Sequence, residues 1–168
     1  MQSCTSAKTS INSARLPAVY RKAPLLTTGI VFDYGAGRYT DRIEQYVQTA
    51  HRVYLPYDPY NLPDEINRFS VTLVLYAMHV RYPVDVVCSN VLNVIDDDDT
   101  VRKIANHIEE IITDTGGTGY VTVYEGNRSG AGRQTGTDQY QRNEPLRNYL
   151  KYFRNATIKN GMIIVAGQ

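Results

Sequence analysis

Two glycines and an acid follow two short apolar runs in the first half of the chain. Asp33-Tyr34-Gly35-Ala36-Gly37 ends the apolar run 30–34, and Asp58 follows the run 53–57, 21 residues beyond Gly37. Glycine lets the backbone approach a ligand closely, and free amides at a helix start face an anion or a nucleotide. A carboxylate at the second position can accept hydrogen bonds from ribose hydroxyls. The pair predicts a site for an adenosine-containing ligand, and a tight turn with an ordinary acidic loop residue is the alternative.

The elements that must position these residues alternate between strands and helices. Short apolar, β-rich runs predict strands, and apolar residues at a spacing of three and four predict helices. The predicted strands are 30–34, 53–57, 84–89 and 120–124, and the predicted helices are 41–50, 63–82, a helix that begins after Asp96–Asp99, and 143–154. The helix 63–82 carries Ile66, Phe69, Leu73, Val74, Ala77, Met78 and Val80, although residues 70–76 also alternate like a strand.

The end of the chain predicts an antiparallel hairpin, because Asn160-Gly161 separates two β-rich runs, and this dipeptide favours a tight hairpin turn. The expected fold is therefore α/β, with a Rossmann-like, mostly parallel sheet closed by a C-terminal antiparallel hairpin. We expect residues 30–168 to form one domain and residues 1–29 to form an extended basic segment. The length of 168 residues suits a single globular core.

Two kinds of adenosine ligand fit the glycine turn and the acid: S-adenosylmethionine (SAM) and nicotinamide dinucleotides. A dinucleotide site usually has a third glycine, where this chain has Thr40, and it needs a second mononucleotide-binding half. The predicted antiparallel hairpin takes the place of that half. The pattern favours SAM.

The glycine turn after the first predicted strand, the acid after the second and the final hairpin resemble the pattern of class I methyltransferases, which place an Asp-x-Gly-x-Gly turn, an acid and a hairpin at these positions. Four separated motifs are more specific: Asp33-Tyr34-Gly35-Ala36-Gly37, Tyr57-Asp58-Pro59-Tyr60, Ser89-Asn90-Val91-Leu92-Asn93-Val94-Ile95, and the stretch 137–143 with Gln141. In these motifs the chain is similar to a small group of predicted methyltransferases that is common in phage-type genomes and related to proteins associated with DNA phosphorothioation.

This resemblance implies a SAM-dependent methyltransferase with cofactor contacts at Asp33, Gly35, Gly37, Asp58 and Asn90. The usual third strand, with its adenine-contacting acid, is not recognisable between Asp58 and Val84. Asp58-Pro59-Tyr60 is also similar to the Asn/Asp-Pro-Pro-Tyr motif of amino-methylating DNA enzymes. That motif belongs after the fourth strand and this one follows the second, so we reject the match.

Methyl transfer depends mainly on alignment of the reacting groups, and a base is needed only for a protonated nucleophile. The candidate catalytic residues are the polar groups at predicted strand ends: Asn90, Asn93, Tyr124 and Glu125. A cap or turn role is the alternative for each of them.

The candidate substrate-binding residues lie in and after a stretch rich in Gly, Ser, Thr and Arg, at 127–137, which we expect to be a mobile loop. They are Arg128, Arg133, Gln141 and Arg142. Residues 1–29 carry a charge of +4 and residues 126–168 carry +5, against −8 for the middle of the chain. Basic ends favour an anionic acceptor such as nucleic acid, and a small-molecule acceptor remains the alternative. A non-catalytic SAM-fold module that binds nucleic acid or a partner protein is the competing function.

Other patterns point to a cytoplasmic protein without a metal site. No apolar run is long enough to span a bilayer, and residues 1–13 lack the apolar stretch of a signal peptide. Cys4 and Cys88 do not make a disulfide framework, and we expect Cys88 in the core. The three histidines are scattered along the chain. The acids of 96–99 are expected to cap the helix that follows.

Overall fold

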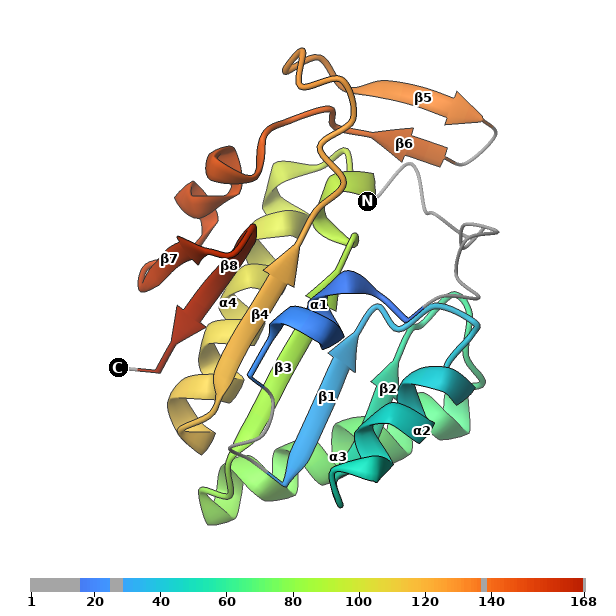
Figure 1. Ribbon diagram of the computed structural model, residues 1–168, viewed down its shortest axis with the longest axis vertical. Coiled ribbons are helices and arrows are strands. Elements are labelled where there is room, and N and C mark those ends of the chain that lie inside the picture. Colours follow the sequence, from blue (N-terminus) through green and yellow to red (C-terminus); the bar gives the residue numbers. More distant parts are fainter. Residues whose placement is uncertain (1–15, 25–28, 137–138, 168) are drawn as a thin grey trace.

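A computed structural model describes residues 16–24, 29–136 and 139–167 of the chain. At its centre lies a six-stranded sheet in the order β2-β1-β3-β4-β8-β7 (Figure 1). The strands are β1 (Ile30–Tyr34), β2 (Val53–Tyr57), β3 (Val84–Ser89), β4 (Thr118–Thr122), β7 (Ala156–Lys159) and β8 (Met162–Ala166). The strands β2, β1, β3 and β4 pair in parallel, and β8 and β7 extend the sheet antiparallel. The protein is therefore α/β, with a mostly parallel sheet that is compatible with a Rossmann-like fold.

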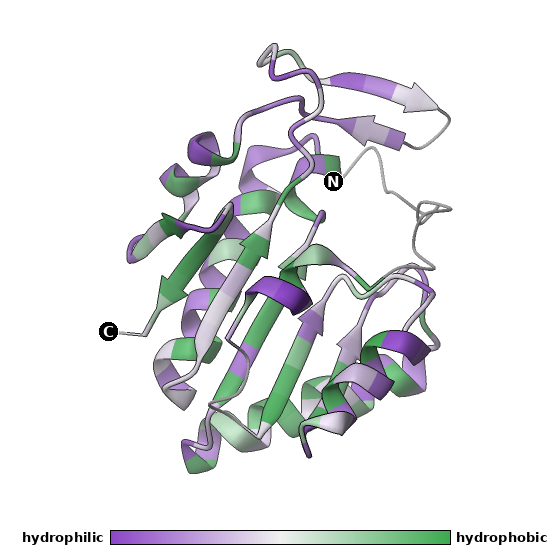
Figure 2. Cartoon of the chain, in the orientation of Figure 1, coloured by the Kyte–Doolittle hydropathy of each residue, from purple (hydrophilic) through white to green (hydrophobic). Residues whose placement is uncertain are grey.

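Buried side chains lie on both faces of this sheet, because successive strand residues point to opposite faces. Phe32, Val86 and Val121 belong to the cluster under α3 (Asp64–Val80), α4 (Asp98–Thr115) and the 3-10 helix η4 (Leu146–Tyr152). Val31 and Val87 belong to a second cluster on the other face, under α1 (Ala18–Lys22) and α2 (Asp41–Thr49). Figure 2 shows the strongest hydrophobic colour along the central strands, as a sheet covered on both faces requires.

The predicted hairpin and helix cap are confirmed. β7 and β8 pair around Asn160 and Gly161, whose φ angles of 54° and 71° are those of a tight hairpin turn. The carboxylate of Asp97 accepts hydrogen bonds from the amides of Asp99 and Thr100 and so caps α4. Cys88 is fully buried in the core, as expected, and Cys4 lies outside the described residues.

Within the segment 63–82, Asp64–Val80 form a helix, so the alternative interpretation of 70–76 as a strand is wrong. Only part of the apolar pattern marks its buried side, however. α3 buries Asn67, Ser70, Val74 and Ala77, and the two polar members bond to the end of β2. Residues 58–83 contain this helix and no strand, so β2 is the edge of the sheet.

Three expectations from the sequence differ from the structure. Residues 18–22 form α1 rather than an extended stretch, because Val19 and Tyr20 are buried against the sheet. Residues 146–152 form the 3-10 helix η4 instead of an α-helix over 143–154. The expected loop 127–137 contains β5 (Arg133–Gly136), which pairs antiparallel with β6 (Gln139–Gln141).

Figure 1 shows the β5–β6 hairpin standing apart from the main sheet, beyond the carboxyl end of β4. All four residues of β5 are exposed, and Figure 2 shows mostly hydrophilic colour over it. None of the helices in 16–24, 29–136 and 139–167 is both long and apolar enough to cross a membrane. The cytoplasmic location stays a prediction.

Candidate functional site

The turn after β1 is held close to the end of β2. Gly35 and Gly37 have φ angles of 82° and 71°, which glycine adopts without strain. The amides of Gly35 and Ala36 donate to the Tyr57 carbonyl oxygen at 2.7 and 3.1 Å. A Cβ on Gly35 would lie 2.2 Å from Cγ2 of Val91. Glycine is therefore required at position 35 both by conformation and by space.

Asp58 joins this turn to the end of β2 and is 6% exposed. Its Oδ2 accepts from the Gly37 amide at 2.9 Å and from Nδ2 of Asn61 at 3.1 Å. Its Oδ1 accepts from the amides of Tyr60 and Asn61 at 2.9 and 3.1 Å. A carboxylate has about four lone-pair sites, so these four bonds occupy the whole group. The sequence predicts that Gly37 and Asp58 contact one ligand; the structure shows a direct hydrogen bond between them, which gives the acid a bracing role.

Asn67 of α3 fixes the backbone of Asp58 from behind. Its Oδ1 accepts from the Asp58 amide at 2.8 Å, and its Nδ2 donates to the Asp58 carbonyl at 3.1 Å. Sequence reasoning missed both Asn61 and Asn67. A polar residue among the apolar positions of a predicted helix was the available signal for Asn67, because buried polar groups are kept where they are hydrogen-bonded.

Asp33 points away from the turn, toward the face covered by α1 and α2. It is 2% exposed, and its Oδ2 accepts from the Tyr54 hydroxyl at 2.8 Å. Burial raises the pKa of Asp33 to about 6, against the opposing effect of its tyrosine hydrogen bonds. This geometry favours a structural role for Asp33 over the cofactor contact that the resemblance implied.

Asn93, Tyr124 and Gln141 come together at the carboxyl ends of β3 and β4. Asn93 Nδ2 donates to Gln141 Oε1 at 3.1 Å, and Gln141 Nε2 donates to the Tyr124 carbonyl at 2.8 Å. The Tyr124 amide contacts Asn93 Oδ1 at 3.4 Å. Asn93 and Gln141 are both buried, so this triangle fastens β6 to the main sheet. Asn90 is exposed, with a φ of 59°, and Tyr124 has a 64% exposed side chain.

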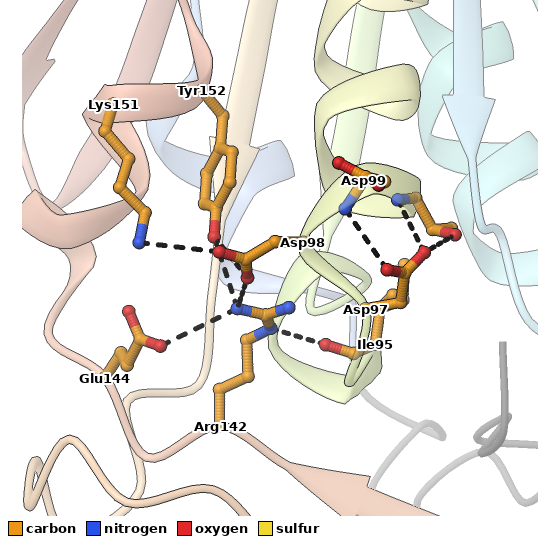
Figure 3. Close-up of polar contacts among 9 residues, drawn as sticks. Ile95, Asp97, Asp98, Asp99, Arg142, Glu144, Lys151 and Tyr152 are labelled. Carbon is orange, nitrogen blue, oxygen red and sulfur yellow. Dashed lines mark hydrogen bonds and ion pairs between the residues drawn. The ribbon is translucent and has the colours of Figure 1, made fainter.

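Arg142 lies in a buried polar network rather than on the surface (Figure 3). Its Nη1 lies 2.6 Å from Asp98 Oδ1 and donates to the Tyr152 hydroxyl at 3.2 Å, and its Nε donates to the Ile95 carbonyl. Tyr152 in turn donates to Asp98 at 2.8 Å. The hydrogen bond from Arg142, followed by that from Tyr152, lowers the pKa of Asp98. Arg142 is only 4% exposed, which favours an anchoring role over the predicted substrate contact.

Partly buried Glu125 and exposed Arg128 form an ion pair beside an open depression of about 520 Å³. Glu125 Oε1 accepts from the Leu146 amide at 2.5 Å, and Oε2 accepts from Arg128 Nε at 2.6 Å. The bond from Leu146, and then Arg128, lowers the pKa of Glu125, so its carboxylate is a weak base. Tyr124 also lines this depression, which lies near the end of β4 and not at the glycine turn. Arg133 is exposed at the start of β5.

Seven of the predicted site residues gather in two groups. Gly35, Gly37 and Asp58 form the glycine-turn corner at the ends of β1 and β2. Asn93, Tyr124, Gln141 and Arg142 form the hairpin corner at the ends of β3 and β4. Among the described residues, no three His, Cys, Asp or Glu side chains gather as metal ligands would.

Fold and site together define an α/β protein with a braced glycine turn at the carboxyl edge of a mostly parallel sheet. Compared with known proteins, the chain matches no family model, no curated protein and no solved structure.

Proposed function

We propose that the protein is a SAM-dependent methyltransferase whose acceptor is nucleic acid or a small molecule. The observation that carries the proposal is the contact of the Gly37 amide with the Asp58 carboxylate at 2.9 Å, at the carboxyl ends of two adjacent parallel strands. Ligands of α/β sheets bind outside this edge, where the glycine backbone and the acid can reach one molecule. The antiparallel pairing of β8 with β4 supports SAM over a dinucleotide, in line with the resemblance seen in the sequence.

The fit of SAM depends on Gly35, Gly37 and Asp58. When bound, SAM supplies the methyl group that is transferred. The bare backbone at Gly35 and Gly37 gives a ligand close access, and Asp58 accepts hydrogen bonds from ribose hydroxyls once Asn61 Nδ2 releases Oδ2. Exposed Asn90 and Tyr124 stand at neighbouring strand ends and orient the acceptor. Buried Asn93 acts on the acceptor only through the position of Tyr124.

Calorimetric titration with SAM and with its demethylated product tests this proposal. We expect both to bind the wild-type protein and Gly35→Ala to abolish binding, because its Cβ meets Val91. Gly130→Ala is the matched control, because Gly130 also has a positive φ, of 75°, but open space around its Cβ position. Wild-type protein that binds neither compound would refute the cofactor assignment. Binding of NAD instead would indicate an oxidoreductase.

A second candidate is a non-catalytic module of the same fold that binds nucleic acid or a partner protein. It is favoured by the four hydrogen bonds that already occupy the Asp58 carboxylate. Binding of nucleic acid or of a partner protein, without methylation of DNA, RNA or a metabolite pool, would support this candidate.

Nucleic acid is the acceptor that we favour, because Arg128 and Arg133 are exposed beyond the end of β4. Phosphate contacts release counterions, so log affinity should fall with log salt by about 0.7 to 0.9 per neutralised phosphate. The double change Arg128→Ala/Arg133→Ala should flatten this slope by about one to two units. Lys103→Ala, an exposed cation on α4, should leave the slope unchanged. Absence of salt-sensitive binding to single- or double-stranded DNA or RNA would leave a small molecule as the acceptor.

A further inference from the structure

α3 presents a line of apolar side chains to solvent. Ile66, Phe69, Tyr76 and Val80 are 39%, 60%, 63% and 47% exposed, and Leu73 between them is half-buried. We call these five residues the α3 stripe. They follow one another at intervals of three, four, three and four, which is the a/d spacing of a helix that packs lengthwise on another helix. Contiguous exposed apolar patches of a few hundred Å² are often interaction sites.

The position of the α3 stripe is fixed by contacts on the other side of the helix. Asn67 bonds to the backbone of Asp58, and Ser70 Oγ donates to the Pro56 carbonyl at 2.7 Å. These polar bonds hold α3 in one rotation about its axis. Turning the stripe into the core would break them and leave polar groups of β2 without partners, which costs free energy. The stripe is therefore held outward by the fold.

We propose that the α3 stripe is a dimer interface on which α3 of a second copy packs antiparallel. The stripe is nearly symmetric about Leu73: Ile66 and Val80 each lie seven residues from it, and Phe69 and Tyr76 lie four and three residues from it. In an antiparallel pair, Ile66 therefore faces Val80 of the second copy and Phe69 faces Tyr76. A two-fold symmetric dimer needs a patch that is complementary to itself in this way. Aromatic residues at the centre of such a patch supply most of the binding energy.

The charges next to the stripe favour the same antiparallel arrangement. Glu65 lies at the first turn of α3 and Arg81 at its C-terminal cap, at equal distances in sequence from Leu73. Antiparallel packing places each Glu65 beside Arg81 of the second copy. Parallel packing would instead bring Glu65 beside Glu65 and Arg81 beside Arg81.

The area of the surface suits a weak dimer. The four exposed stripe side chains offer on the order of 400 Å² of apolar surface per copy. Flanking polar residues bring the pair near the roughly 1,200 Å² at the lower end of specific interfaces. The adjacent sheet edge is less suited to pairing, because Pro56 in β2 has no amide proton to donate.

Sedimentation equilibrium on the full chain tests this proposal, which does not depend on the proposed function. We expect a reversible dimer with a micromolar dissociation constant, which Phe69→Glu or Tyr76→Glu raises by at least about 100-fold. Leu75→Glu is the matched control: Leu75 lies on the same helix and is 56% exposed, but it lies outside the stripe. We expect it to leave the dissociation constant within about threefold. A wild-type monomer at all concentrations, or equal effects of Leu75→Glu and Phe69→Glu, would overturn the proposal.

Charge reversal tests the orientation of the two helices. Glu65→Arg should raise the dissociation constant about tenfold, because it places two cations together at both ends of the pair. The double variant Glu65→Arg/Arg81→Glu should restore the wild-type value. If Glu65→Arg has no effect, or if the double variant is weaker than the single one, the antiparallel arrangement is wrong. Circular dichroism of each variant confirms that α3 still forms.

Discussion

The glycine-turn corner and the hairpin corner lie at the same edge of the sheet but are held together differently. In the first, Asp58 bonds to groups 2, 3 and 21 residues away. In the second, Asn93 and Arg142 bond to partners 48 and 47 residues away, among others. The first corner is built from one β-α-β unit, and the second joins β3, α4 and the β5–β6 hairpin. Contacts within one β-α-β unit produce a recognisable residue spacing in the sequence, whereas contacts between distant segments produce almost no such pattern.

The substitution with the largest expected effect disrupts the glycine-turn corner. Asp58→Ala removes four hydrogen bonds from one buried carboxylate, and the amides of Gly37, Tyr60 and Asn61 lose their partner. We expect the free energy of unfolding to fall by about 4 kcal/mol. Urea denaturation measures this loss, and Asp64→Ala, an exposed acid at the start of α3, should cost less than about 1 kcal/mol. A fully stable Asp58→Ala protein would show that the bracing is not needed.

The next effect depends on pH and concerns Asp33, beneath the same corner. Its pKa is raised from 3.8 to about 6, so the folded state binds the proton more tightly than the unfolded state does. Ionisation of Asp33 therefore does not lower the free energy of unfolding below pH 3.8. The loss begins as the pH rises above this value and is complete above about pH 6. Relative to Asp33→Asn, the wild-type protein should lose about 3 kcal/mol of unfolding free energy between pH 3.5 and 7.

Urea denaturation of both proteins across this range provides the measurement for Asp33. Asparagine can still accept the Tyr54 hydrogen bond, so the difference between the two proteins reports the ionisation. Parallel pH profiles would contradict the raised pKa.

A smaller effect separates two arginines that look alike in the sequence. Arg142→Met removes the contacts to Ile95, Asp98 and Tyr152, and we expect a loss of about 2 kcal/mol. The loss is limited because the Asp98 side chain is 57% exposed and stays solvated without its partner. Arg128→Met changes an exposed side chain that pairs with Glu125 and should alter stability by no more than about 0.5 kcal/mol. Equal losses for the two variants would mean that the hairpin corner does not depend on Arg142.

The strands, the main helices and the closing hairpin could be predicted because apolar periodicity and turn residues report local structure. β5 could not, because Arg133–Gly136 is exposed on all four residues and has no apolar pattern. The position of Gly37 and Asp58 at the ends of adjacent strands could be predicted from their spacing, whereas the hydrogen bond between them could not. The burial of Arg142 could not be predicted, since its residue type does not reveal its hydrogen-bond partners, Asp98 and Tyr152, which lie 44 and 10 residues away in the sequence.

α3 shows a second limit of reasoning from periodicity. Its apolar residues fit a helix, but only Val74 and Ala77 among them are fully buried, because Asn67 and Ser70 occupy the other buried positions and satisfy the end of β2. The rotation of α3 about its axis is therefore set by the hydrogen bonds that it makes to the end of β2, rather than by the burial of as many apolar side chains as possible. The sequence alone does not show which of these two requirements sets the rotation.

The β5–β6 hairpin is joined to the segments that follow β3 and β4 through Gln141 and Arg142, while β5 itself is wholly exposed. Such a region opens at a much lower free energy than the central strands. Amide protons of β5 should therefore exchange with deuterated solvent long before those of β3, in molecules that are otherwise folded. The hairpin can thus rearrange or be cleaved by a protease while the sheet and the glycine turn stay intact.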